Sequence, residues 1–437
     1  MHSTSAPRPA VAVKHLTIPH LRWYICGALF FGTMVNYVDR GTIAILAPHL
    51  QSLFHWSEKD YGQIVFAFQL SYTIMMVVSG GLMDRLGTRA GYALAMAWWS
   101  VAAAAHALAR SVFAFGVIRF LLGAGEAGNF PASIKGVAEW FPKKERALAT
   151  GIFNSGTNIG AVVAYPIVGW LLIRWGWQTA FVATGGLGLL SLVLWLILYR
   201  VPQRHPWITE AELSHIEDRE GRQEQDKEAL PVPWANVLGY REAWGFMLAK
   251  FMTDPIWWFY LFWLPKYLVQ VRGFSIAMLA WFGAIPFFAA SFGSIAGGWL
   301  SGWLIKRGWR VNGARKMAMA VCAFCMPAGI IAVLSGNAWT ALALISLAAS
   351  AHQGWSANLF TLPSDMFAKK DVGSVVGLGG ATGAFGGMVI ALVAGQILQV
   401  FHTYVPLFII AGVMHPLAFG VVQLMIPKIR PVEARIS

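Results

Sequence analysis

Long apolar runs separated by short polar segments dominate the chain. Runs such as 90–109, 152–173 and 179–199 are each close to the ~20 residues that a helix needs to cross ~30 Å of hydrocarbon. In lipid, only helices and closed barrels satisfy their backbone polar groups. Because strand-like alternation of apolar and polar residues is absent, the pattern predicts an all-α membrane protein.

The runs form two groups of six around a charged middle segment. The first group covers residues 22–48, 60–83, 90–109, 111–138, 147–174 and 178–199, and the second covers 243–271, 275–304, 316–336, 338–364, 373–399 and 404–426. This repeat is typical of duplicated transporters. We therefore expect twelve transmembrane helices in two pseudo-symmetric halves around a central cavity. The expected parts are a tail (1–20), a first half (21–199), a linker (200–241), a second half (242–427) and a tail (428–437).

Composition supports a membrane location. Hydrophobic residues make up 57% of the chain and charged residues 12%, whereas soluble domains carry roughly 25% charged residues. The 21 tryptophans suit the lipid–water interfaces. The net charge of +13 comes from loops between apolar runs, so we expect contacts with membrane lipids and no nucleic-acid binding. Cys322 and Cys325 lie one turn apart, a spacing that suits neither a disulfide nor a complete metal site.

The distribution of Lys and Arg predicts the orientation. If both termini are cytoplasmic, the cytoplasmic side holds 24 of the 33 basic residues, which fits the positive-inside bias. The outer side then holds Lys59, Arg110, Arg174, Lys266 and Arg272. We expect a multi-pass protein of the inner (cytoplasmic) membrane.

Apart from Lys135 and charges at the ends of the runs, four charged residues lie inside the apolar runs of the first half. These are Asp39, Arg40, Arg119 and Glu126, and a charge in hydrocarbon costs at least ~2.5–3.5 kcal/mol on insertion scales. If helix one ends near Pro48, Asp39 and Arg119 lie at similar depth, which predicts an ion pair between them. Glu126 follows Arg119 by two turns, so both side chains lie on one helix face, ~10 Å apart.

Glycines recur every fourth residue in three helices and predict close helix contacts. The sets are Gly156 with Gly160, Gly293 with Gly297, and Gly379 with Gly383 and Gly387. Static packing and sliding during alternating access remain alternatives. Gly123, Gly125 and Gly128 match a dinucleotide fingerprint in spacing, but no strand precedes them. No ATP-binding loop is present, and we expect no cofactor.

The loop after the second run reads GGLMDRLGTR over 80–89. This sequence resembles the signature loop of the major facilitator superfamily. The resemblance implies that Asp84, Arg85 and Arg89 latch the two halves in the outward-open state. The equivalent segment of the second half, 297–302, has Gly302 where an acid is usual.

Further segments resemble the anion:cation symporter branch of that family. They are NYVDR at 36–40 and RFLLGAGEAGNFP at 119–131, while TDPIWWFY at 253–260 and HQGWSAN at 352–358 are most similar to bacterial hexuronate carriers. The resemblance covers nearly the whole chain. It implies proton-coupled import of an organic anion such as a hexuronate or a related sugar acid.

These observations predict a transporter with no catalytic residues, which works as a monomer and is not an enzyme. Arg40, with no acid required as its partner, binds the substrate carboxylate; Arg119 exchanges partners between Asp39 and substrate; and Asp39 and Glu126 carry protons. The residues expected to line the sugar side are Tyr37, Tyr72, Asn129, Asn158, Gln353, Trp355 and Asn358.

Other interpretations of single residues and of the function remain open. Lys250 and Asp254 are spaced for a structural i,i+4 pair, and His352 is either a proton relay or a hydrogen-bonded packing residue. An organophosphate/phosphate antiporter of the same fold is one alternative function, although the seventh helix offers only Lys250 where such carriers use arginine. A multidrug exporter and a transporter-like sensor that binds its ligand without moving it are the others.

Overall fold

The computed structural model describes residues 17–216, 237–367 and 369–432. Within these ranges the chain forms helices joined by short turns, and no strand occurs. The expected all-α fold is therefore confirmed for the described part of the chain.

The first half contains seven helical elements. They are α1 (Leu21–Phe54), α2 (Glu58–Ala105), the 3-10 helix η1 (His106–Leu108), α3 (Val112–Glu126), α4 (Asn129–Trp140), α5 (Lys143–Trp175) and α6 (Trp177–Leu198). Helix α2 combines two predicted spans and is broken at Gly87, whose φ of 75° is outside the helical region. The predicted span 111–138 is divided into α3 and α4 after Glu126.

The linker and the second half follow. The described part of the linker holds η2 (Pro202–Arg204) and α7 (Glu210–Ile216), and the second half holds α10 (Arg241–Gln270), α11 (Ile276–Phe282), α12 (Ile285–Lys306), α13 (Val311–Cys325), α14 (Ala328–Leu334), α15 (Ala338–Leu359), α16 (Leu362–Met366), α17 (Lys369–Phe401) and α18 (Val405–Met425). Three predicted spans of the second half each form two consecutive helices, as 111–138 does in the first half, and all twelve predicted spans are helical.

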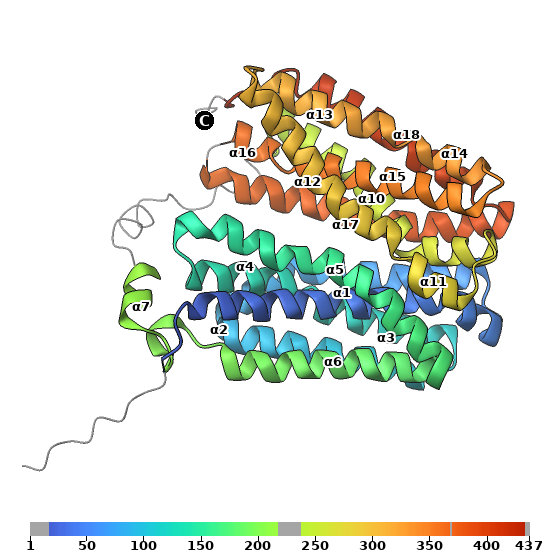
Figure 1. The fold of residues 1–437 in the computed structure, drawn as a ribbon, viewed down its shortest axis with the longest axis horizontal. Helices are drawn as coiled ribbons and strands as arrows, with labels where there is room; N and C mark the ends of the chain where they lie inside the picture. Colours follow the sequence, from blue (N-terminus) through green and yellow to red (C-terminus); the bar gives the residue numbers. More distant parts are fainter. Residues whose placement is uncertain (1–16, 217–236, 368, 433–437) are drawn as a thin grey trace, which may run out of the picture.

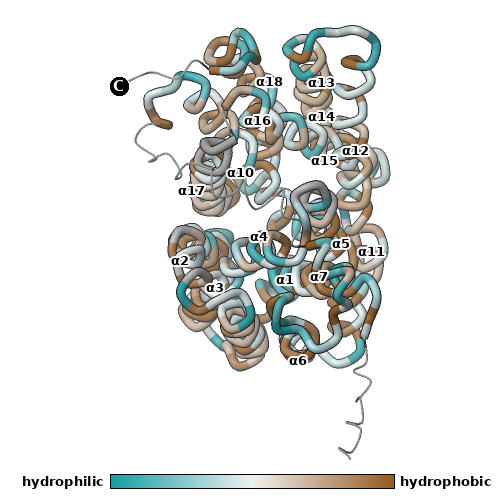
Figure 2. Tube along the Cα trace, turned by 90° about the vertical axis from the view of Figure 1, so that its left-hand side faces the viewer, coloured by the Kyte–Doolittle hydropathy of each residue, from teal (hydrophilic) through white to brown (hydrophobic). Residues whose placement is uncertain are grey.

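The helices form two bundles that lie side by side (Figures 1 and 2). Helices α10 and α17 of the second half face α1 and α2 of the first, and α11 packs against α5. We call the end of the molecule that carries α7 the linker end, and the opposite end, with the turn between α1 and α2, the far end (Figure 1).

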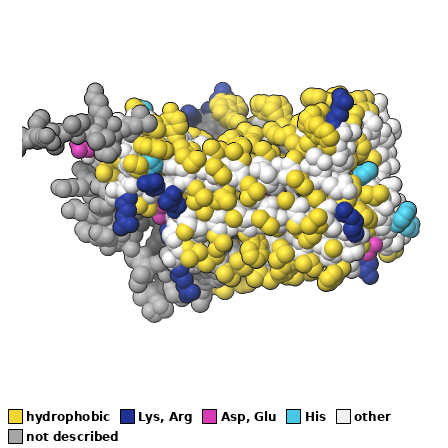
Figure 3. Space-filling model, turned by 90° about the horizontal axis from the view of Figure 1, so that it is seen from below, with side chains coloured by type: hydrophobic (Ala, Val, Ile, Leu, Met, Phe, Trp, Pro, Cys, Tyr) yellow, Lys and Arg dark blue, Asp and Glu magenta, His cyan; other side chains and the backbone are white. Residues whose placement is uncertain are grey.

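The outer surface suits a bilayer. Six stretches of the described chain are long and apolar enough to cross a membrane: Ala149–Trp175, Trp177–Leu198, Ile276–Lys306, Val311–Leu334, Val375–Phe401 and Val405–Met425. The other helices include α1, α3 and α10, which carry the buried charges of Arg40, Glu126 and Lys250. Figure 3 shows a broad hydrophobic surface on which Lys and Arg gather towards the two ends of the molecule.

Each predicted glycine face packs against a helix of its own half. A Cβ atom on Gly160 would collide with the carbonyl oxygen of Met34 in α1, and one on Gly297 would lie 2.5 Å from the Cα of Gly354 in α15. The α17 glycines likewise contact α10. Within this structure the three faces serve packing inside a half.

The linker is fastened to the start of α1. The Glu212 carboxylate in α7 accepts hydrogen bonds from the backbone N–H groups of Leu21 (2.8 Å) and Arg22 (3.1 Å), and from the Arg22 guanidinium (2.9 Å). Glu145 also pairs with Arg22 at 2.9 Å and with His215 at 3.0 Å. Partial burial raises the pKa of Glu145, but the hydrogen bonds from His215 and Arg22 outweigh it and hold this pKa below its ordinary value. A carboxylate at a helix N-terminus satisfies free N–H groups and interacts favourably with the helix dipole.

We expect the Glu212→Ala variant to be less stable, by about 1–2 kcal/mol, because two backbone N–H groups and Arg22 lose their shared acceptor. Thermal unfolding of the detergent-solubilised protein measures the effect. Glu210→Ala is the control, since Glu210 lies on the same helix and is exposed. Equal melting temperatures for the two variants would contradict the capping role.

Candidate functional site

A buried ion pair joins α1 to α3 within the membrane-spanning region. The Nε atom of Arg40 donates to Glu126 at 2.9 Å, and the two side chains are 1% and 0% exposed. Arg40 also donates through Nη2 to the side-chain oxygen of Asn36 at 3.2 Å. Arg40 was expected to need no acidic partner, and the structure gives it one.

The predicted ion pair between Asp39 and Arg119 is wrong in this structure. Arg119 donates through Nη2 to the backbone oxygen of Arg40 at 3.3 Å, and neither carboxylate oxygen of Asp39 has a hydrogen-bond partner in the described chain. The estimate of depth took α1 to end near Pro48, whereas α1 continues to Phe54. Arg119 reaches the α1 backbone beside Asp39, but it bonds the carbonyl oxygen of Arg40 and not the Asp39 carboxylate.

Four aromatic rings surround the Arg40 guanidinium, and we call them the Arg40 cage. The Arg40 Cζ atom lies 4.5 Å from the ring centre of Tyr37, 4.7 Å from Tyr72, 5.3 Å from Phe68 and 5.4 Å from Trp258. Desolvated cation–π contacts are each worth up to about 2 kcal/mol. Trp258 belongs to α10, so the cage contains residues of both halves.

The two arginines retain hydrogen-bond donors that no described residue uses. These buried atoms are Nη1 of Arg40 and both Nε and Nη1 of Arg119. Arg119 lies over Phe68, with its Cζ atom 4.7 Å from the ring centre. An unpaired buried donor costs about 1–3 kcal/mol or more when charged, and a planar guanidinium suits a carboxylate. The arrangement can therefore bind an organic anion.

Three of the residues expected to line the sugar side use their contacts inside their own half. Asn129 accepts from the Tyr92 hydroxyl at 2.5 Å, and Asn358 donates to the Gly297 carbonyl at 2.9 Å. The Trp355 ring contacts His415 and Phe419 of α18. Helix periodicity did not distinguish packing faces from cavity faces for these residues.

The other predicted site residues have varied surroundings. Tyr37 and Tyr72 belong to the Arg40 cage, and Asn158 and Gln353 are half-buried. Of the expected latch, the Asp84 side chain lies outside the described residues, Arg85 is exposed, and Arg89 donates to the Leu196 carbonyl of its own half at 2.7 Å. The latch remains a prediction.

The second half contains two further polar pairs. Lys250 and Asp254 form the expected i,i+4 ion pair at 2.7 Å. His352 Nδ1 lies 3.1 Å from His415 Nε2, and the His352 ring stacks on Trp257. No group of three or more potential metal ligands occurs among the described residues.

The sequence did not indicate Phe68, His415 or Phe262, whose ring centre lies 5.8 Å from the Arg119 Cζ atom. It also gave Trp258 no role. The spacing of four residues between Phe68 and Tyr72 was a usable signal, because it places both rings on one helix face.

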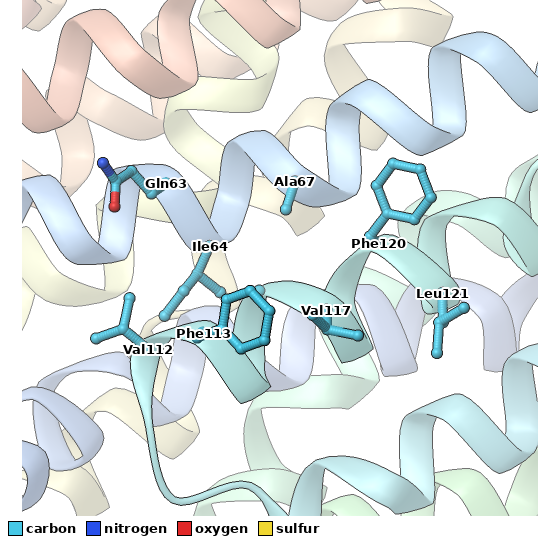
Figure 4. A pocket seen from close by; sticks show the side chains of 9 residues that line it. Gln63, Ile64, Ala67, Val112, Phe113, Val117, Phe120 and Leu121 are labelled. Atoms are coloured by element: carbon cyan, nitrogen blue, oxygen red, sulfur yellow. The ribbon is translucent and has the colours of Figure 1, made fainter.

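A groove of about 370 Å³ between α2 and α3 is separate from these charges (Figure 4). Its lining is apolar except for Gln63, and Phe113 is 81% exposed. The groove offers no charged group to an anion, and its exposed apolar lining suits lipid.

Two helical bundles that enclose paired charges within a membrane define a polytopic membrane transporter rather than an enzyme. The chain belongs to the Major Facilitator Superfamily, whose family model matches residues 29–361.

Similar proteins transport sugar acids. The chain is 35% identical to the hexuronate transporter of Escherichia coli strain K12, over 91% of this chain and 92% of that protein. It is also 35% identical to the galacturonate transporter of Dickeya chrysanthemi, over 71% of this chain and 90% of the relative. The inward-open structure of the xylose transporter from E. coli shares the fold, with a TM-score of 0.73 at 16% identity, covering 93% of this chain and 96% of that one.

We expect Arg40→Lys to recover little of the ligand binding that Arg40→Ala loses. Lysine keeps the charge, but it cannot bond Glu126, Asn36 and a carboxylate through one planar group. Calorimetric titration with D-glucuronate and D-galacturonate measures the affinity. Near-normal affinity in Arg40→Lys would show that the planar guanidinium is not required for binding. Near-normal affinity in Arg40→Ala would show that Arg40 does not bind the ligand carboxylate.

Proposed function

We propose that the chain is a proton-coupled symporter that imports a hexuronate or a related sugar acid by alternating access. The observation that carries the proposal is the buried Arg40–Glu126 ion pair, because it places a proton acceptor on the group best suited to bind a carboxylate. The named substrates of the relatives at 35% identity supply the substrate class.

Competition between Glu126 and the substrate carboxylate for Arg40 couples proton movement to substrate movement. While Glu126 is ionised, it holds the Arg40 guanidinium, and a second carboxylate would meet a like charge. Protonation of Glu126 weakens this pair and frees Arg40 for the substrate carboxylate. Arg119 has spare donors beside the same site, and Asp39 is the second proton carrier. Breaking a buried pair costs about 3–5 kcal/mol when one charge is left uncompensated, and the arriving substrate carboxylate compensates Arg40.

The linker end is the cytoplasmic side in this proposal, with both termini there, and the membrane is the inner membrane. The excess of Lys and Arg in the loops of that end supports this orientation. A single chain contains both halves of the site, which is sufficient for transport by a monomer.

Contacts at the far end support an inward-facing arrangement. The hydrogen bonds and the ion pair that join described residues of one half to described residues of the other lie at the far end. The Tyr61 hydroxyl donates to the Phe262 carbonyl at 2.7 Å, Gln270 donates to Gln51 at 3.4 Å, and Lys266 pairs with Glu58. The far end would have to separate for substrate to enter from outside.

Uptake into proteoliposomes tests the proposal. With an inward-directed proton gradient, labelled D-glucuronate or D-galacturonate should accumulate, and a protonophore should abolish accumulation. An organophosphate/phosphate antiporter would instead need phosphate inside the vesicles. A sensor would bind the sugar acid without moving it.

We expect Glu126→Gln to bind substrate and to catalyse exchange but not net uptake. The amide resembles the protonated acid, so the loaded carrier can form, yet the empty carrier cannot return after releasing a proton. Counterflow and net uptake in the same proteoliposomes separate the two steps. Loss of both would indicate a binding or folding role, whereas retention of both would leave Asp39 as the proton carrier.

We expect Glu58→Gln to open the far end, because the Lys266 side chain, which is 0% exposed in this arrangement, loses its charged partner. Spin labels at Lys59→Cys and His402→Cys, both exposed far-end positions, would report a larger population of long distances. The labelling uses a background without the three native cysteines.

Asp60→Asn is the matched control for the far end. It also removes one negative charge there, but the hydrogen bonds of Asp60 are with Ser57 in its own turn. An identical distance distribution in both variants would contradict a closing role for the Glu58–Lys266 pair.

A further inference from the structure

Gln69 of α2 is a buried amide without a hydrogen-bond partner. Its side chain is fully buried, and both Nε2 and Oε1 lack a partner in the described chain. The buried amides of Asn36 and Asn358 each have one unpartnered atom, whereas Gln69 has both donor and acceptor unused. Burying such a group without a partner is unfavourable by about 1–3 kcal/mol per polar atom.

The position of Gln69 on its helix places it beside the Arg40 cage. At 100° per residue, Gln69 lies about 60° around α2 from Tyr72 and about 100° from Phe68. Both of these rings contact Arg40. Gln69 therefore lies on the helix surface beside the two cage residues of α2.

The same geometry directs Gln69 towards the second half. Gln69 and Gly62 are seven residues apart, so they lie within about 20° of each other on the α2 surface. A Cβ on Gly62 would lie 3.1 Å from the Cα of Gly395 and 2.9 Å from the carbonyl oxygen of Ala391, both in α17. Gln69 thus occupies the α17-facing side of α2, and α17 in turn contacts Trp258 of the Arg40 cage through Gly387.

We propose that Gln69 is a substrate-positioning residue that binds a hydroxyl group of the sugar acid while Arg40 binds its carboxylate. A primary amide donates and accepts at once, as does a hydroxyl group, so one contact can use both unpaired atoms. Because a site built to hydrogen-bond a hydroxyl rejects an analogue that lacks it, Gln69 separates polyhydroxylated acids from simple carboxylates. This inference rests on the proposed function.

The test uses Gln69→Leu, which keeps the approximate size of the side chain and removes the amide. Affinity for D-glucuronate or D-galacturonate should fall about tenfold, the effect of one lost hydrogen bond. Thermal stability of the substrate-free protein should be unchanged or higher, because an unsatisfied buried group has been removed. A residue that only supports packing would instead lose stability.

Gln63→Leu is the matched control. Gln63 lies on the same helix, about 120° around it from Gln69, is exposed, and lines the apolar groove. Its substitution should leave affinity unchanged.

Deoxy analogues of the sugar acid complete the experiment. One analogue should lose affinity for the wild-type protein but bind Gln69→Leu as well as the parent compound does, which identifies the hydroxyl bound by Gln69. If Gln69→Leu binds the parent acid with wild-type affinity, or if every deoxy analogue weakens both proteins equally, the inference is overturned. Failure of the wild-type protein to bind any sugar acid would overturn the proposed function instead.

Discussion

A charge inside a bilayer is tolerated only with a partner, and the Arg40–Glu126 ion pair is the constraint on which the first half is organised. Close helix approach makes the pair and its surroundings possible. A Cβ on Gly123 of α3 would lie 2.5 Å from the carbonyl oxygen of Phe68 in α2. Because glycine has no side chain, α2 can approach α3 closely enough for the Phe68 ring to contact both arginines. Gly160 of α5 similarly lies against Tyr37. Glycine therefore serves the site through packing.

The same ion pair links the site to the relative position of the halves. Trp258 completes the Arg40 cage from α10, and Gly387 of α17 packs against its indole ring. A movement of the second half that carries α10 and α17 away would remove one wall of the cage and expose Arg40 to water. Ligand binding can shift such an equilibrium only through contacts that differ between the two states, and the contact of Trp258 with Arg40 is one that such a movement would change.

The sequence was sufficient to predict the twelve spans, because their length and apolar character are set by the bilayer. It also identified Arg40, Arg119 and Glu126 as buried charges, since no lipid-facing helix tolerates them. The partners were not predictable in the same way. Pairing depends on how far each helix extends and how it is rotated, and α1 extends six residues past Pro48. For the same reason Asn129 and Asn358 were indistinguishable from cavity residues until their neighbours Tyr92 and Gly297 were known.

The two halves contribute different chemistry to the site. The first half supplies the charged atoms, and the unused donors of Arg40 and Arg119 lie there with the unpaired carboxylate of Asp39. The second half supplies rings such as Trp258 and Phe262, while its own buried pair, Lys250 with Asp254, is already neutralised. The donors suited to a carboxylate therefore belong to the first half, whereas rings of the second half lie over both arginines at the boundary between the halves. Under the proposed function, recognition at that boundary would depend on shape and hydroxyl contacts, so substitutions there would change which sugar acid is bound without disturbing the charge that binds the carboxylate.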